Sequence, residues 1–374
     1  MSSLKVGMIG GGQIAKAHVL AYRAIGLLDQ NSSPVLTTIA EADENLARSA
    51  SERLGFKTWT ADWKKVTRSE DIELVDIITP TFLHAEQAID GAEHGKHLLC
   101  EKPLATNASD AKKMYEAVRK AKVANLVGFN YRKVPAVALA RKISTSGDLG
   151  DIYQFRASFQ EDWAANQDMV LTWRYSKKTA GGGALADLGS HIVDLARFLV
   201  GDVTSVCGIQ NTFIKERKMQ GSDSMGLVDV DDSTIALLKF KGKDVLGRVE
   251  TCWSAPGRRV FLEFELNGSE GSVYFNLERP NELQLYTSQD LKDKQGIRTI
   301  LIGPTHPYGD RMIFPAAGAG MGYEDSLVNE ISELVSAINS NSNTEPSFYD
   351  GWKTSEILEA IQLSCAREEW VHLS

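Results

Sequence analysis

Asp187 and His191 are the residues whose types and spacing most directly suggest acid–base chemistry. Residues 184–200 have the apolar periodicity of one helix, and a separation of four positions places the two side chains on one helical face. A carboxylate beside an imidazole can orient the ring and keep its pKa near the working pH. Such a pair can take a hydroxyl proton while a hydride leaves the same carbon, although a purely structural pair would have the same pattern.

A lysine at the end of an apolar strand is the second candidate. Residues 98–100 are apolar, and Glu101, Lys102 and Pro103 follow them directly. Open α/β sheets bind ligands at the carboxyl ends of their strands. Lys102 could therefore donate a hydrogen bond to a substrate oxygen or stabilise an alkoxide. By residue type alone, it could equally be an exposed lysine that takes no part in chemistry.

A glycine-rich turn near the N-terminus indicates a nucleotide site. Gly10, Gly11 and Gly12 begin a segment that fits the G-x-G-x-x-[GA] fingerprint, between an apolar strand at residues 6–9 and a helix at residues 14–25. In such a turn, backbone N–H groups and the helix N-terminus can bind a pyrophosphate. A turn of this composition can also simply join a strand to a helix.

Glu41 is the expected partner of the glycine turn, because it follows the second predicted strand at residues 35–40. An acid at this place accepts a hydrogen bond from the ribose 2′-hydroxyl of NAD. No Arg or Lys occurs within the next six residues, so NAD is favoured over NADP. An inserted loop at residues 26–34 accounts for the long spacing from Gly10. Alternatively, Glu41 is an N-terminal charge of the next helix.

The elements that must position these residues fall into two patterns. Over about the first 130 residues, short apolar runs alternate with helical segments, which predicts an α/β Rossmann domain with a doubly wound parallel sheet at residues 1–130. Beyond it, most apolar runs read as strands, which predicts an α+β domain at residues 131–374 with a large open, mostly antiparallel sheet. Two C-terminal helices, at residues 324–338 and 354–366, can pack back towards the first domain.

Composition excludes several classes of function. The formal net charge of −8 disfavours nucleic-acid binding, and the sequence has no apolar run long enough to cross a membrane and no secretory leader, so we expect a cytoplasmic protein. The cysteines form no CxxC pair, so we expect no metal site and no redox motif. They are interpreted as small buried hydrophobic residues in a reducing compartment: Cys100, Cys207, Cys252 and Cys365.

The chain resembles the Gfo/Idh/MocA family, the glucose–fructose oxidoreductase and inositol dehydrogenase superfamily. Three segments together carry the resemblance: the turn at residues 10–15, Glu101-Lys102-Pro103 and the Asp187-xxx-His191 pair. The similarity spans nearly the whole chain. Further stretches resemble one sugar-oxidising subgroup of the family: Lys16-Ala-His18, Phe129-Asn-Tyr-Arg132, Thr172-Trp-Arg174, Val228-Asp-Val-Asp-Asp232 and Gly303-Pro-Thr-His-Pro-Tyr-Gly309. Glu41 replaces the Asp that is more frequent in the family and can accept the same hydrogen bonds.

The resemblance implies an NAD-dependent dehydrogenase that oxidises a secondary hydroxyl of a sugar or cyclic polyol to a ketone, with its site between the two domains. It makes Lys102 the residue that binds the substrate oxygen and relays a proton, Asp187 a substrate-binding and tuning residue, and His191 the general base. It also implies a homodimer or homotetramer formed through the open sheet face.

The resemblance also implies two sets of binding residues. The cofactor set is Gly10, Gly12, Gln13, Ile14, Glu41, Thr79, Pro80, His84, Glu101 and Asn130. The substrate set is Tyr131, Gln160, Trp173, Arg174 and His306. In the second set, Trp173 could stack on a sugar and Gln160 could bond a hydroxyl, but either could equally belong to the scaffold. His306 lies in a Gly- and Pro-rich loop at residues 302–322, which could cover a site or be a surface connection.

Three alternatives remain at this point. An inositol, or one of several pyranose sugars, could be the substrate of the same chemistry. An NAD-dependent glycosidase could share the fold, although no residue pattern points to it. A non-catalytic NAD-binding regulator is disfavoured because Lys102, Asp187 and His191 are all present.

Overall fold

The computed structural model describes residues 3–28, 33–316 and 318–373, so residues 29–32 of the predicted inserted loop and residue 317 of the late loop lie outside the described residues. The chain divides into two compact units. The first comprises Met1–Lys133 with Gly322–Lys353, and the second comprises Val134–Met321 with Thr354–Ser374. The predicted functional boundary at residue 130 stays a prediction.

The first unit is built on a six-stranded sheet of order β3-β2-β1-β4-β5-β6. Every neighbouring pair is parallel, which confirms the doubly wound sheet. The chain runs outward from β1 to β3 and then returns to β4 beside β1, so the strand order reverses there. The strands are β1 (Lys5–Ile9), β2 (Val35–Ala40), β3 (Thr58–Thr60), β4 (Leu74–Ile77), β5 (His97–Cys100) and β6 (Asn125–Val127).

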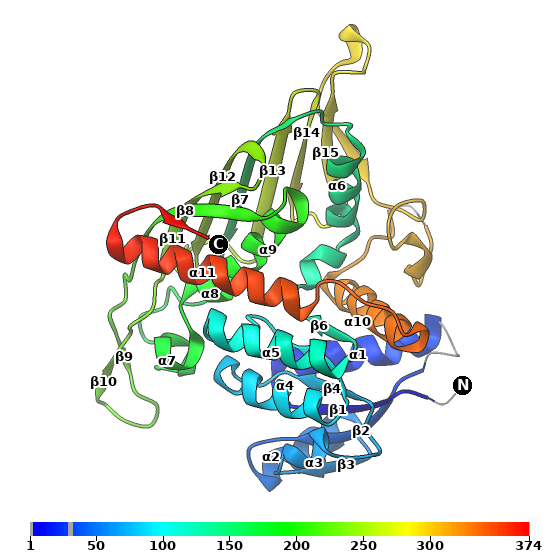
Figure 1. The fold of residues 1–374 in the computed structure, drawn as a ribbon, viewed down its shortest axis with the longest axis vertical. Helices are drawn as coiled ribbons and strands as arrows, with labels where there is room; N and C mark the ends of the chain where they lie inside the picture. The colour runs from blue at the N-terminus through cyan, green and yellow to red at the C-terminus, as the bar shows by residue number, and fades with distance from the viewer. Residues whose placement is uncertain (1–2, 29–32, 317, 374) are drawn as a thin grey trace. The chain divides into compact units, whose positions relative to one another are not determined.

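Helices cover both faces of this sheet (Figure 1). One face carries α1 (Gln13–Leu28), α2 (Glu44–Leu54) and α10 (Tyr323–Ser340), and the other carries α3 (Lys64–Thr67), α4 (His84–Glu93) and α5 (Ala108–Ala121). Phe348, at the start of α11 (Phe348–Arg367), joins the second cluster. Because both faces are buried, the central strands consist almost entirely of apolar residues. Asp76 in β4 is a fully buried exception, and its burial matters for the site.

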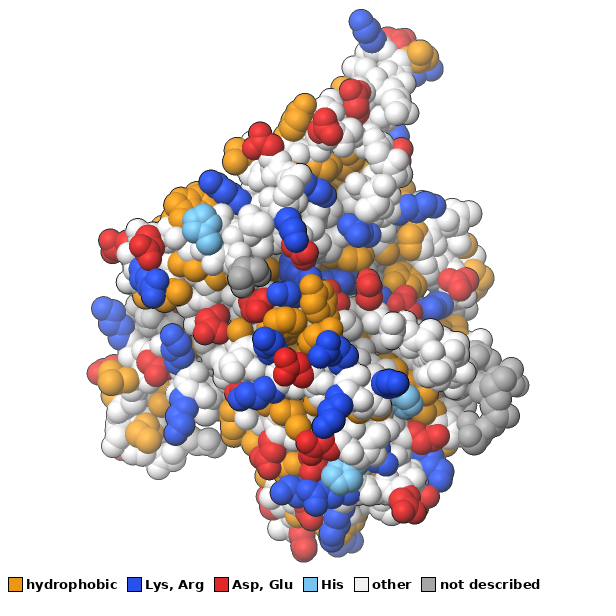
Figure 2. Space-filling view, in the orientation of Figure 1, with side chains coloured by type: hydrophobic (Ala, Val, Ile, Leu, Met, Phe, Trp, Pro, Cys, Tyr) orange, Lys and Arg blue, Asp and Glu red, His pale blue; other side chains and the backbone are white. Residues whose placement is uncertain are grey.

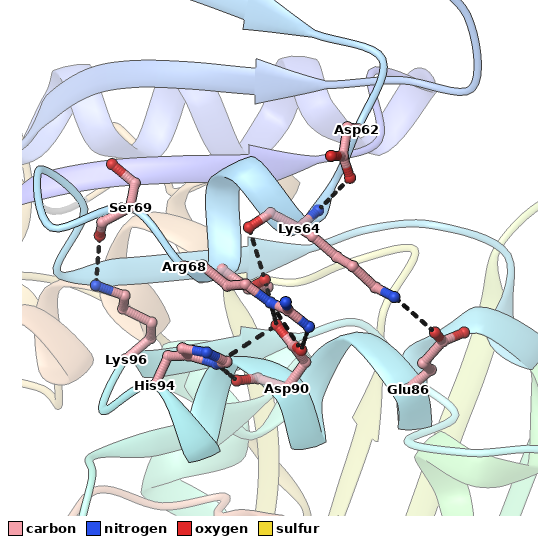
Figure 3. Close-up of polar contacts among 9 residues, drawn as sticks. Asp62, Lys64, Arg68, Ser69, Glu86, Asp90, His94 and Lys96 are labelled. Carbon is pink, nitrogen blue, oxygen red and sulfur yellow. Dashed lines mark hydrogen bonds and ion pairs between the residues drawn. The ribbon is translucent and has the colours of Figure 1, made fainter.

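A polar network ties α3 to α4 in the first unit (Figure 3). Asp90 accepts hydrogen bonds from Thr67 Oγ1 and from Arg68 Nη2, each at 2.6 Å. His94 Nδ1 lies 3.6 Å from the same carboxylate. Lys96 Nζ donates to the carbonyl oxygens of Ser69 and Ile72, in the segment that follows α3. Figure 2 shows acidic and basic side chains interspersed over the surface of α4 and α5, in keeping with a mixed-charge surface.

The second unit is built on a nine-stranded sheet of order β16-β15-β14-β13-β7-β12-β11-β8-β17. The pair β7–β12 is parallel and the other neighbours are antiparallel, which confirms the large, mostly antiparallel sheet. The strands are β7 (Ile152–Gln160), β8 (Val203–Asn211), β11 (Ser233–Phe240), β12 (Lys243–Cys252), β13 (Phe261–Gly268), β14 (Gly271–Asn276), β15 (Glu282–Thr287), β16 (Arg298–Leu301) and β17 (Val371–His372). A separate two-stranded ribbon pairs β9 (Glu216–Lys218) with β10 (Met225–Leu227).

Helices pack on one face of this second sheet: α6 (Pro135–Ser146) on β14 and β15, α8 (Ala184–Asp187) on β11 and β12, and α9 (Gly189–Leu199) on β7 and β12. The prediction of one helix over residues 184–200 is wrong. The helix is interrupted at Leu188, where the His191 N–H bonds to the Leu188 carbonyl three residues back, a tighter turn than that of an α-helix. Leu188 keeps right-handed helical angles, so the chain continues in helical form.

The remaining helical segments are short. They are α7 (Lys177–Ala180) and the 3₁₀ turns η2 (Thr81–Leu83), η3 (Asn130–Lys133), η4 (Trp173–Tyr175), η5 (Lys292–Lys294) and η6 (Gly309–Arg311). Among the described residues, no helix has the length and apolar character needed to cross a membrane.

Replacing Asp90 by Asn should destabilise the protein by about 1–3 kcal/mol near neutral pH, because Thr67 and Arg68 lose a charged acceptor. Burial raises the pKa of Asp90, but the hydrogen bonds from Arg68 and Thr67 outweigh it and lower the pKa overall. The stabilisation is therefore present above the ordinary aspartate pKa and is lost as the pH falls through the lowered one. Denaturant unfolding of both proteins should show the difference shrinking below about pH 4.

Asp71→Asn is the matched control, because Asp71 is 79% exposed and pairs with Lys5 at the surface. It should leave the unfolding midpoint nearly unchanged. An equal loss in both variants, or a loss that persists at acid pH, would contradict the role assigned to Asp90.

Candidate functional site

The glycine turn lies between the ends of three strands of the first unit. Gly10 has φ +105°, and a Cβ there would lie 2.9 Å from the Ile78 carbonyl oxygen, so only glycine fits. Its N–H donates to the Ala40 carbonyl at 2.9 Å. A Cβ at Gly12, in contrast, would meet no described atom within 4 Å. The space beside Gly12, together with the N-terminus of α1, which begins at Gln13 and Ile14, fits the phosphates of a dinucleotide.

Glu41 lies against the same turn. Its Oε1 accepts a hydrogen bond from the Gly11 N–H at 2.6 Å, and its Oε2 accepts one from the Ala42 N–H at 3.1 Å. The Arg53 guanidinium, on α2, donates to the Gly11 carbonyl at 2.6 Å. Sequence reasoning missed Arg53 because it looked for a positive group only within six residues of Glu41. The carboxylate is held at the end of β2, where recognition of a ribose hydroxyl is expected.

His84 connects the segments that follow β4 and β5. Its Nε2 lies 2.8 Å from the Thr79 carbonyl oxygen, and its Nδ1 lies 3.2 Å from the Pro103 carbonyl oxygen. Burial lowers the pKa of the imidazole despite these contacts. The Thr79 hydroxyl donates to Gln87 at 2.7 Å, Pro80 follows it, and the Lys102–Pro103 peptide is cis. His84 therefore orders the loop that carries Lys102, while a direct contact of His84 with the cofactor stays a prediction.

Behind Lys102 lies a buried charged cluster that sequence reasoning did not find. His18 Nδ1 is 2.9 Å from Asp76 Oδ2, and His18 Nε2 is 3.2 Å from Glu101 Oε1. Tyr22 donates to Asp76 at 3.1 Å, and the Lys102 N–H donates to Glu101 Oε2 at 3.1 Å. The signal was weak because His18 stands within an amphipathic helix and Asp76 within an apolar strand.

Opposing effects set the protonation of this cluster. Burial lowers the pKa of His18, but the charges and hydrogen bonds of Asp76 and Glu101 outweigh it and raise that pKa well above its ordinary value. Burial likewise raises the pKa of Glu101, but His18 and then Lys102 bring it below its ordinary value. The cluster therefore holds an imidazolium and the ionised carboxylate of Glu101 inside the protein.

Residues from α10 complete this corner of the first unit. Asn130 donates to Ser326 Oγ at 2.9 Å, and the Tyr131 ring lies edge-on to Tyr323 at 6.2 Å between centroids. The Tyr323 hydroxyl lies in the field of the Glu101 carboxylate. Burial, and then this charge, raise the pKa of Tyr323. No local pattern could have revealed these partners, because α10 lies far along the chain.

In the second unit, one buried carboxylate anchors the segment that carries Asp187 and His191. Asp231 accepts hydrogen bonds from the N–H groups of Gly183 and Leu185, both at 2.8 Å. A Cβ at Gly183 would lie 1.8 Å from the Asp231 carbonyl oxygen, so glycine is required there. Asp187 is the last residue of α8, and His191 is buried in the first turn of α9.

The other predicted substrate residues lie in the second unit with partners of their own. Gln160 donates to Glu250 at 3.1 Å, and the Arg174 guanidinium lies 4.5 Å from the centre of the Trp173 ring. His306 Nδ1 accepts a hydrogen bond from the Gly303 N–H at 3.0 Å. The structure thus groups Lys102 and Tyr131 with the cofactor residues in one unit, and the remaining candidates in the other. Their joint binding of a sugar stays a prediction.

Comparison with known proteins gives the family. A model described as "Oxidoreductase family, NAD-binding Rossmann fold" matches residues 4–129, and one described as "GFO/IDH/MocA C-terminal domain" matches residues 137–274. The chain belongs to the GFO/IDH/MocA oxidoreductase family. The matches confirm the predicted resemblance and an oxidoreductase that uses NAD.

Among GFO/IDH/MocA relatives, levoglucosan dehydrogenase of Pseudarthrobacter phenanthrenivorans is 42% identical, over 99% of this chain and 98% of the relative. Inositol 2-dehydrogenase of Rhizobium meliloti is 24% identical over 100% of both chains. A solved structure of levoglucosan dehydrogenase in complex with NADH and levoglucosan has a TM-score of 0.96, with 42% identity and 99% of each chain covered.

Gly12→Val should raise the Kd for NADH by about tenfold or more in this GFO/IDH/MocA protein, because the side chain would fill space that the phosphates need. The fold should not change, since the new Cβ meets no described atom. Titration of NADH fluorescence measures the Kd, and thermal unfolding checks the fold.

Gly296→Val is the matched control, because a Cβ there also meets no described atom and Gly296 lies in the second unit. It should bind NADH as the wild type does. If Gly12→Val binds NADH equally well, the turn has been misassigned as the phosphate site.

Proposed function

We propose that this chain is an NAD-dependent dehydrogenase that oxidises a secondary hydroxyl of a pyranose sugar to a ketone, with levoglucosan, at C3, as the leading substrate. The observation that carries the proposal is the 42% identity to levoglucosan dehydrogenase over nearly the full length of both chains. The glycine turn, Glu41, Lys102, Asp187 and His191 support it, because each supplies a part that this chemistry needs.

The proposed mechanism divides the reaction among three side chains. The His191 imidazole takes the proton of the sugar hydroxyl as general base. The Asp187 carboxylate binds the substrate and tunes the proton affinity of that base. The Lys102 ammonium donates a hydrogen bond to the same sugar oxygen and stabilises the developing alkoxide. NAD, when bound, supplies the hydride acceptor, and Gly10, Gly12 and Glu41 would hold it.

Substrate assays test the proposal directly. Purified protein with NAD should form NADH with levoglucosan at a higher kcat/KM than with glucose, xylose, inositols or related glycosides. Highest activity with an inositol would move the assignment to the inositol branch of the family. Release of an aglycone without net NADH would indicate a glycosidase. Failure of every sugar to reduce NAD would exclude the proposed function.

Lys102→Ala should lower kcat/KM by about a hundredfold or more, because the sugar oxygen loses its charged donor. The Kd for NADH should change by less than about threefold. Lys120→Ala, at an exposed position of α5, is the control and should retain wild-type turnover. Wild-type kcat/KM in Lys102→Ala would show that the lysine has been misassigned.

We also propose that the chain forms a homodimer or homotetramer through the open face of its nine-stranded sheet. Large apolar side chains on this face are exposed, among them Ile209 (70%), Ile235 (39%), Leu237 (48%) and Leu246 (65%). Ile235 is directly opposite Ile209 in the β8–β11 register, so the exposed side chains are neighbours. An apolar face of this kind is costly to leave in water.

Leu246→Glu should therefore lower the molar mass measured by light scattering, because it buries a charge in the proposed interface. Leu291→Glu, at another exposed leucine of the second unit, should keep the wild-type mass. A wild-type protein that is monomeric at micromolar concentration, or a Leu246→Glu variant with unchanged mass, would contradict this interface.

We further place the protein in the cytoplasm. Its four cysteines are all free thiols, which supports a reducing compartment. Cys100 is fully buried within the first sheet, where burial raises the pKa of the thiol and keeps it unreactive.

A further inference from the structure

We propose that His18 is a positioning residue for the dehydrogenation: as a buried imidazolium, it holds the Glu101 carboxylate ionised and fixed, and thereby keeps Lys102 placed and charged for the sugar oxygen. The proposal rests on the proposed function, since it assumes that Lys102 acts on a sugar. It assigns a role to a residue on α1 that is remote in sequence from the Glu101-Lys102-Pro103 segment.

The geometry of the imidazole favours two protons on the ring. His18 is fully buried, and each ring nitrogen faces a carboxylate oxygen, Asp76 at 2.9 Å and Glu101 at 3.2 Å. A neutral imidazole has one N–H and could donate to only one of them, which would leave the other nitrogen facing a carboxylate lone pair. With both nitrogens protonated, both contacts become charge-assisted hydrogen bonds.

The surrounding groups leave this imidazolium as the central cation of the cluster. Burial and then the charge of Asp76 raise the pKa of Tyr22, so it stays a neutral donor. Burial and then the charge of Glu101 raise the pKa of Glu330 well above its ordinary value, which disfavours a further anion there. The other charged groups that act on the cluster are Lys102 on Glu101, and Lys133 and Glu333 on Glu330.

Two cations act on the Glu101 carboxylate, the His18 imidazolium and Lys102. The charge of Lys102 helps to hold the pKa of Glu101 down, so each favours the charged form of the other. Without the donor and the charge of His18, the pKa of the buried Glu101 carboxyl would rise, because burial opposes its ionisation. Lys102 would then lose a fixed countercharge.

Glu101 can transmit this effect because its carboxylate is held on three sides. His18 bonds Oε1, and the Lys102 backbone N–H donates to Oε2 at 3.1 Å. Gly128, beyond the end of β6, packs so closely that a Cβ there would lie 3.0 Å from Oε1. A shift of the carboxylate therefore moves the backbone from which the Lys102 side chain extends.

Two substitutions of His18 separate its hydrogen bond to Glu101 from its hydrogen bond to Asp76. The amide nitrogen of Gln can replace Nε2, so His18→Gln keeps a donor to Glu101, whereas the amide nitrogen of Asn replaces Nδ1, so His18→Asn keeps only the donor to Asp76. We expect kcat/KM to fall by less than about tenfold in His18→Gln and by about a hundredfold in His18→Asn. Tyr22→Phe is the control, because it removes a hydrogen bond from Asp76 and leaves Glu101 untouched.

The pH profile distinguishes positioning from a merely structural role. His18 lowers the pKa of Glu101, so in His18→Asn this carboxylate should ionise at a higher pH. The acid limb of kcat/KM contains two steps, protonation of the proposed base His191 and protonation of Glu101. The Glu101 step should move to higher pH by about one unit in His18→Asn, by less in His18→Gln, and not at all in Tyr22→Phe. Equal activity losses in all three variants with an unshifted acid limb would overturn the proposal.

A measurement that needs no substrate separates this proposal from the proposed function. In wild-type protein labelled with nitrogen-15 histidine, the signal that disappears in His18→Gln should be that of a doubly protonated ring at about pH 8.5. A neutral ring there would overturn the proposal. An imidazolium in a protein that oxidises no sugar would instead exclude the proposed function. If His18→Asn fails to unfold cooperatively, the acid limbs of His18→Gln and Tyr22→Phe are compared instead. A shift in His18→Gln alone supports the proposal, and equal limbs overturn it.

Discussion

The burial of both faces of the parallel sheet is the constraint on which the first unit depends. Helices cover each face, so a polar side chain on a central strand must find its partners inside the protein. Only the ends of the strands are left for a ligand. The glycine turn after β1, Glu41 after β2 and the Glu101-Lys102-Pro103 segment after β5 are all at this edge.

The same constraint explains why Asp76 does not stand alone in β4. An isolated ionised carboxylate at full burial would be very costly, and His18 and Tyr22 offset that cost by charge and hydrogen bonding. The second nitrogen of the same imidazole contacts Glu101, whose carboxylate accepts a hydrogen bond from the Lys102 N–H. The ring that partners Asp76 therefore also contacts the segment that carries Lys102. One ring thus connects Asp76 in the core with Glu101, the residue before Lys102.

The second unit uses a buried carboxylate for a different purpose. Asp231 receives the backbone N–H groups at the start of α8 rather than a side-chain cation, and burial raises the pKa of Asp231 despite these bonds. Its neighbour Asp232 accepts the Trp253 indole N–H at 2.6 Å. The two aspartates therefore hold the glycine segment and the sheet together, and the helices that carry Asp187 and His191 begin from this anchored point.

The sequence by itself determined that an α/β part is followed by an α+β part, because strand and helix periodicities are local. It also predicted the glycine turn and Glu41, whose spacing follows from the strand–turn–helix geometry, and the family, whose motifs are short and contiguous. Only the tertiary structure decided the break at Leu188 and the partners of Glu101. His18, Asp76, Tyr323 and Arg53 come from separate elements, and their roles arise from burial and from contacts that no local pattern records.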